Sequence, residues 1–202
     1  GGTTSPSLLA TAGTWQTTYR GGLADGWVAR FSPLADSLKA LTFVGGPHYD
    51  QTYFMDLDTD GDVYIAGHCT GNASDFPMTV NTYGEAQGGQ FIIKLPPDLS
   101  APEYVSRFGV NDGDPDLSMT AMLVDLCENV YVSGWAGNTA TLAATQPNPG
   151  TGFSYNSPQG GYETYSDTIT PAFDNTFSGA GDFYFYVLER DADTLLFTSY
   201  FG

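Results

Sequence analysis

Basic residues are scarce in this sequence. Its 202 residues include 6 Lys and Arg against 23 Asp and Glu, which gives a formal net charge of −17 at pH 7. The two lysines, Lys39 and Lys94, lie far apart, and no basic patch can be drawn. Nucleic acids and anionic membranes are bound through clustered Lys and Arg, so the composition argues against both as partners.

Long apolar runs and metal-type cysteine spacing are also missing. No run approaches the roughly 18 apolar residues that a membrane-spanning helix needs, so membrane insertion is not expected. Cys69 and Cys127 lack the spacing of a zinc site, and two histidines are too few for one without acidic ligands. The first residues show no charged segment followed by an apolar one. We therefore expect either a removed signal peptide or an internal piece of a longer chain.

Turn formers and aromatic residues are abundant instead. The chain has 25 Gly, 12 Pro, 13 Tyr and 13 Phe, and only 14% of its residues are charged. This composition is typical of an extracellular β-protein rather than of a cytosolic enzyme. It predicts an extracellular or bacterial cell-surface location.

Two kinds of segment recur along the chain. "DVYIAG" (62–67) returns as "NVYVSG" (129–134), and the residues that precede each copy also correspond. A second unit of strand, polar turn and strand occurs three times and ends each time in glycine. The pattern predicts inner hairpins at 53–67 and 120–134 and outer hairpins at 26–45, 90–109 and 183–202.

Such a recurrence of four short strands predicts an all-β fold built from β-propeller blades, each a sheet of four antiparallel strands. A β-sandwich would explain the strands but not the copies. The predicted hairpins are too few for a closed propeller, which needs about four blades. Residues 1–202 are therefore expected to form an incomplete part of a larger propeller, with other domains in a longer parent chain.

The segment "GGPHYDQTYFMDLDTDGDVYIAGHCTGNASDFPMT" (45–79) resembles the bacterial SBBP-type β-propeller repeat. The likeness lies in the double glycine, the Asp-x-x-Gly turn, the "VYIAG" strand and the "SDFPMT" tail. It implies a propeller module of a secreted or cell-surface protein, with no catalytic motif to carry over. The second copy departs from the pattern, because Glu128 stands where the first has the turn glycine Gly61.

A long insertion separates the second inner hairpin from the third outer one. It covers 145–169, is rich in Gly, Pro, Asn and Ser, and contains Phe153, Tyr155, Tyr162 and Tyr165. Tyrosine presents a large contact area at a low entropic cost, so these side chains are candidates for binding a protein or a sugar. A loop without a function remains the alternative.

The stretch "DLDTDG" (56–61) resembles the start of a calcium loop. An EF-type loop needs a bidentate Glu at its twelfth position, where this chain has Gly67. In the second copy, Leu123 and Cys127 stand in the positions of Asp56 and Asp60. We therefore interpret the stretch as a hairpin turn and expect no cofactor. Weak calcium binding by Asp58, Asp60 and Asp62 is the alternative.

The remaining candidate residues are His68 and Trp135, which occupy equivalent positions after the inner strands, and Asp56, which is predicted to face an axial channel. No nucleophile motif of the GxSxG type is present, so catalysis has no support in the sequence. Cys69 and Cys127 are expected at opposite ends of their blades, too far apart for a disulfide.

These features lead to two hypotheses. The first is a non-enzymatic propeller module for protein–protein interaction, adhesion or assembly at the cell surface. The second is a propeller that binds or processes glycans, for which paired carboxylates would serve as acid and base.

Overall fold

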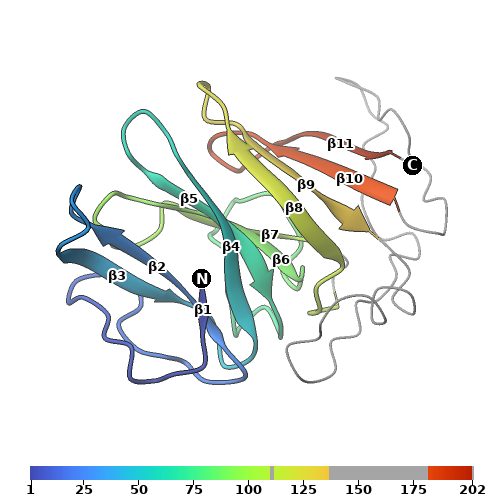
Figure 1. Ribbon diagram of the computed structural model, residues 1–202. Helices are drawn as coiled ribbons and strands as arrows, with labels where there is room; N and C mark the ends of the chain where they lie inside the picture. The colour runs from blue at the N-terminus through green and yellow to red at the C-terminus, as the bar shows by residue number, and fades with distance from the viewer. Residues whose placement is uncertain (110–111, 137–181, 202) are drawn as a thin grey trace.

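The computed structural model describes residues 1–109, 112–136 and 182–201, and all regular elements in these ranges are β-strands (Figure 1). The strands form three antiparallel sheets that follow one another along the chain. The prediction of an all-β fold is thus confirmed for this part of the protein. No helix that could cross a membrane occurs among the described residues.

Each sheet is a meander of neighbouring strands. Sheet 1 consists of β1 (Gly2–Thr3), β2 (Asp25–Phe31) and β3 (Leu38–Val44). Sheet 2 consists of β4 (Asp50–Leu57), β5 (Val63–Cys69), β6 (Gln90–Leu95) and β7 (Tyr104–Phe108). Sheet 3 consists of β8 (Leu117–Val124), β9 (Val130–Ala136), β10 (Asp182–Leu188) and β11 (Leu195–Phe201). None of the three sheets is closed within the described ranges.

The inner strands are longer than the repeats predict. β4 begins at Asp50 and pairs it with Cys69, so the first inner hairpin extends beyond 53–67 at both ends. A register shift occurs between Thr52 and Phe54 and again between Met119 and Ala121, at equivalent positions of the two copies. The inner strands of sheets 2 and 3 are therefore paired in the same way, residue for residue. The predicted insertion at 145–169 lies outside the described residues.

The two inner hairpins are closed by the same turn. Asp58 Oδ1 accepts hydrogen bonds from the backbone N–H groups of Asp60 and Asp62, at 3.0 and 2.9 Å. Asp125 Oδ1 does the same for Cys127 and Asn129, at 2.8 and 2.9 Å. The interpretation of "DLDTDG" as a turn is confirmed. Glu128 adopts φ +67° where Gly61 has +85°, so the substitution of the turn glycine leaves the conformation unchanged.

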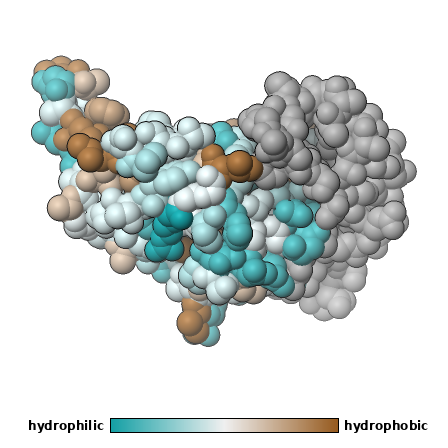
Figure 2. All heavy atoms as spheres, turned by 90° about the horizontal axis from the view of Figure 1, so that it is seen from below, coloured by the Kyte–Doolittle hydropathy of each residue, from teal (hydrophilic) through white to brown (hydrophobic). Residues whose placement is uncertain are grey.

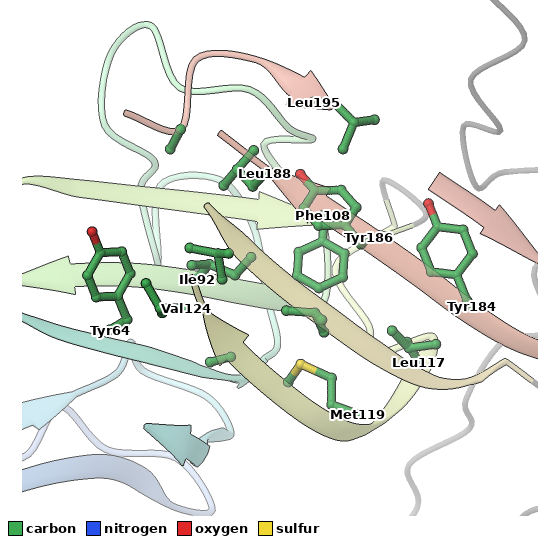
Figure 3. Packing of buried hydrophobic residues seen from close by; sticks show 14 of the residues in the cluster. Tyr64, Ile92, Phe108, Leu117, Met119, Val124, Tyr184, Tyr186, Leu188 and Leu195 are labelled. Atoms are coloured by element: carbon green, nitrogen blue, oxygen red, sulfur yellow. The ribbon is translucent and has the colours of Figure 1, made fainter. Parts of the chain in front are cut away.

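The sheets bury two apolar layers, one on each face of sheet 2. Ile65 and Ile93 pack with Val28 and Val44 of sheet 1. On the opposite face, a second cluster joins sheet 2 to sheet 3 (Figure 3) through residues that include Tyr64, Ile92, Phe108, Leu117, Tyr184, Tyr186 and Leu188. Both faces of β5 and β6 are covered, which explains why their sequences are almost continuously apolar.

The surface seen from below the first view is mostly hydrophilic or neutral, and its apolar side chains lie in separate clusters (Figure 2). This is consistent with the high negative charge of the chain.

Candidate functional site

A groove lies between sheets 2 and 3. Its volume is about 350 Å³, within the range of small-ligand sites. Its walls come from residues 81–85, from the end of β7 and from the β10–β11 hairpin; they are Asn81, Thr82, Tyr83, Gly84, Glu85, Phe108, Gly109, Tyr184, Tyr186, Asp193 and Leu195.

Aromatic rings form much of the groove. The alternation of β10 turns Tyr184 and Tyr186 toward sheet 2, while Phe183 and Phe185 point the other way. Tyr186 stacks on Phe108 of β7, with ring centroids 4.4 Å apart and planes 15° apart (Figure 3). Phe108 belongs to sheet 2 and Tyr186 to sheet 3, so the groove depends on the packing of one sheet on the other.

Backbone contacts hold the outer wall in place. The Tyr83 N–H donates to the Ala192 carbonyl at 2.6 Å, which ties this wall to the β10–β11 turn. The Ser106 hydroxyl donates to the Tyr83 carbonyl at 2.7 Å. Two carboxylates, Glu85 and Asp193, line the groove with the aromatic rings. Rings and carboxylates together can stack on and hydrogen-bond to a polar ligand such as a sugar.

A second cluster surrounds Lys94 on β6. Its side chain is 9% exposed, and its Nζ lies 3.2 to 3.4 Å from four carboxylates, those of Asp58, Asp62, Glu103 and Glu128. It also lies 5.2 Å from the centre of the Tyr64 ring, within cation–π range. Glu128 belongs to the turn of sheet 3, so the cluster crosses between two sheets.

The Lys94 amine stays charged. Burial would lower the pKa of Lys94, but the Tyr64 hydroxyl and the carboxylates of Glu128 and Asp62 outweigh it and raise the pKa above its ordinary value. Burial likewise raises the pKa of Tyr64. A lysine nucleophile or base must lose its proton. The cluster therefore suits a structural joint rather than lysine chemistry.

Two carboxylates of the acidic turn already form ion pairs with this lysine. Asp58 and Asp62 both contact the ammonium of Lys94, whereas Asp60 is exposed. Across the described ranges, no three His, Cys, Asp or Glu side chains converge so as to hold a metal ion. Calcium binding by Asp58, Asp60 and Asp62 stays a prediction that a binding measurement would test.

His68 lies inside the protein. It is 4% exposed, its Nε2 is 2.7 Å from the Leu117 carbonyl, and its ring meets that of Tyr53 edge to face. Burial lowers the pKa of His68 to about 4, so the ring is neutral at pH 7 and Nε2–H donates to the carbonyl. This histidine joins β5 to β8.

The other predicted residues are dispersed. Asp56 Oδ2 accepts a hydrogen bond from the Val124 N–H at 2.9 Å, which joins β4 to β8. Trp135 is partly exposed on β9 and contacts Phe183 edge to face, with centroids 5.3 Å apart. Phe153, Tyr155, Tyr162 and Tyr165 lie outside the described residues. The structure thus does not bring Asp56, His68 and Trp135 into one site.

Sequence reasoning missed the groove and the Lys94 cluster. One signal was present: a single lysine in the apolar strand "FIIKL" predicts a buried charge with acidic partners. The groove has no such signal, because its wall residues come from three separate segments.

No protein-family model matches this sequence, and none of the curated proteins is significantly similar to it. The likeness to SBBP repeats therefore rests on the residues quoted above.

Proposed function

We propose that this chain is part of a larger β-propeller that serves as a non-enzymatic binding module, secreted or at a bacterial cell surface. Three meander sheets follow one another, and β4 and β8, the first strands of the two four-stranded sheets, contact each other. In a propeller, the first strands of the blades line the axis in this way. Sheet 1 then provides the last three strands of its blade.

The outward face of sheet 3, which does not pack on sheet 2, supports further blades. It carries Leu123, Tyr131, Phe183 and Phe185, which are 39 to 56% exposed. Tyr131 pairs with Leu123 and Val187, as Tyr64 pairs with Asp56 and Lys94 in sheet 2. That face of sheet 2 is covered by sheet 3, so we expect another sheet of the same kind to cover the outward face of sheet 3.

The groove between sheets 2 and 3 is the observation that carries the binding role. It is lined by aromatic rings and carboxylates, whereas the side chains of Lys94, Arg107 and His68 make contacts within the fold. The net charge of −17 favours a protein partner with a basic surface, because opposite charges speed association and suppress wrong partners.

A binding experiment separates this function from its alternative. The 202-residue chain is immobilised and exposed to a Lys-rich peptide, with a Glu-rich peptide of equal length as control. We expect binding of the first only, weakened at least tenfold by Glu85→Gln with Asp193→Asn. Equal binding of both peptides, or none, would contradict the proposal.

Glycan binding is the second candidate, favoured by the tyrosines and carboxylates that share the groove. A glycan array followed by mass spectrometry of the bound sugars tests it. Bound and cleaved sugars would establish a glycan-processing enzyme, and bound but intact sugars a lectin-like module.

A further inference from the structure

Two buried aspartates lie side by side where sheet 1 meets sheet 2. Asp25 begins β2 and Asp50 begins β4, and both are 0% exposed. A parallel bridge joins the preceding residues, Ala24 and Tyr49, and the Asp50 N–H donates to the Ala24 carbonyl at 2.8 Å. The two strands thus bring their first carboxyl groups to the same place. We refer to this contact as the Asp25–Asp50 joint.

Only half of the oxygens in this joint have a hydrogen-bond partner. Asp25 Oδ2 accepts from the Arg20 N–H at 2.6 Å, and Asp50 Oδ2 accepts from the Gly46 N–H at 2.7 Å. The Oδ1 atoms of both residues are buried without a partner. A buried carboxylate with an unsatisfied oxygen is costly, and two of them near each other are more so.

Gly45 allows the carboxyl groups to approach. A Cβ at this position would lie 3.0 Å from Asp25 Cγ and 3.1 Å from Asp50 Oδ2. The glycine backbone therefore lies against both side chains and keeps other side chains out of the joint.

One of the two cations near the joint is buried with it, and the other, Arg20, is exposed to solvent. The guanidinium of Arg107 is fully buried near Asp50, and its donors reach the carbonyls of Gly71, Asn72, Phe76 and Gly88. Arg20 is the other nearby cation, and Tyr19, Tyr49 and Cys69 are the nearby neutral titratable groups. Arginine does not lose its proton in proteins, so Arg107 carries one positive charge. One ionised carboxylate is enough to balance that charge within the buried joint.

The next joint, between sheets 2 and 3, has a different composition. There, Gly109 lies against Gln90 and Asp116, so an amide and one carboxyl group, from neighbouring register positions, lie beside the glycine. With its amide oriented by hydrogen bonding, the Gln90 nitrogen donates to the Phe108 carbonyl at 2.8 Å. Its oxygen accepts from the N–H groups of Asp116 and Leu117, at 2.5 and 2.9 Å. An amide both donates and accepts, which an ionised carboxylate cannot do and a protonated carboxyl can.

We propose that Asp25 and Asp50 hold one proton between them at neutral pH, and that its loss loosens sheet 1 from sheet 2. The proton gives the Asp25–Asp50 joint the donor that Gln90 supplies in the other joint. It also leaves a single negative charge to face Arg107. This inference does not depend on the binding role proposed above.

The burial of the two groups also sets the direction in which their pKa values move. Burial raises the pKa of Asp25 to about 6 and that of Asp50 to about 7. Between the ordinary pKa of about 4 and these values, the folded chain binds more protons than the unfolded one. The stability contributed by the joint is therefore fully present near pH 4 and is lost as pH rises through about 6 and 7.

The test compares unfolding of the 202-residue chain in urea at pH 5 and pH 8 with that of Asp50→Asn. In the wild type we expect the joint to raise the unfolding equilibrium constant on the order of 1,000-fold between these pH values. Asp50→Asn should lose most of this rise and be the more stable protein at pH 8. The comparison with the variant is needed because His68 titrates in the opposite direction below pH 6.5.

A matched variant adds a carboxyl group at the other joint instead of removing one. Gln90→Glu places a second carboxyl group beside Asp116 and should add a new loss of stability between pH 5 and 8. Carbon-13 NMR of the Asp25 and Asp50 carboxyl groups in the wild type needs no variant, and should show at least one of them titrating above pH 6. Titration of both near pH 4 would overturn the proposal. So would stabilisation by millimolar Ca²⁺ that Asp50→Asn abolishes, because a cation would then occupy the joint.

Discussion

The Lys94 ammonium of sheet 2 lies 3.2 Å from the Glu128 carboxylate of sheet 3, and this ion pair fixes one sheet against the next. It complements the apolar layer between the same sheets. Three further carboxylates, on Asp58, Asp62 and Glu103, share the same ammonium group.

Removal of this ammonium should destabilise the protein strongly. Lys94→Met keeps much of the apolar stem but leaves four carboxylates to repel each other, so the free energy of unfolding should fall by about 3 kcal/mol. Urea unfolding followed by tryptophan fluorescence measures the loss. The only other lysine, Lys39, is exposed on β3, and Lys39→Met should change stability by less than about 0.5 kcal/mol. Equal effects of the two substitutions would show that the cluster does not hold the sheets together.

His68 should make the protein sensitive to acid. Its pKa is lowered to about 4 by burial, so between pH 6.5 and 4 the unfolded chain binds the proton that the folded chain refuses. Stability should fall through this window by up to about 3 kcal/mol. His68→Gln retains a donor for the Leu117 carbonyl and should remove this part of the pH dependence. His48 is half exposed beside Asp75, and His48→Gln is the matched surface substitution for comparison.

The turn at Gly61 should tolerate few side chains. Its φ of +85° lies in the left-handed region, so Gly61→Ala should cost about 1 kcal/mol although no atom obstructs a methyl group there. Thermal unfolding is a sufficient measure.

Glu128 occupies the position of Gly61 in the second inner hairpin and adopts φ +67° although it has a side chain. Glu128→Gly and Glu128→Ala both remove the carboxylate, but only the first relieves the backbone. The glycine variant should be the more stable by about 1 kcal/mol.

The two cysteines should differ in reactivity. Both are free thiols, Cys69 buried and Cys127 exposed. Burial raises the pKa of Cys69 to about 12, and the thiolate is the nucleophile, so this residue should be inert in the folded protein. An aromatic disulfide reagent should titrate one thiol in the native chain and two in urea. Cys127→Ser should leave none reactive before unfolding.

The strands were predictable because repeated copies of one sequence segment form strands that pair in the same way. Tyr64 and Tyr131 occupy the same place in two strands, and each pairs with the equivalent residue of its first strand. The ends of β4 and β5 were not predictable, because Asp50, Gln51 and His68 are polar and resemble loop residues. Their pairing depends on burial against the neighbouring sheets.

Side-chain clusters were harder to predict than strands. The partners of Lys94 come from the β4–β5 turn, from Glu103 before β7 and from the turn of another sheet, and no spacing along the chain relates them. Asp25 and Asp50 meet only because β2 and β4, strands of different sheets, begin side by side. A prediction of either cluster requires the packing of the sheets, which the repeats alone do not provide.

Gly45 and Gly109 each end an outer hairpin and lie against the joint to the next sheet. The segment between them therefore starts and finishes at equivalent points of the architecture. Duplication or loss of that segment would lengthen or shorten the row by one complete sheet and leave every remaining register intact. Proteins of this design can change size in whole steps, and a chimera that copies residues 46–109 in tandem is the natural way to build a longer one.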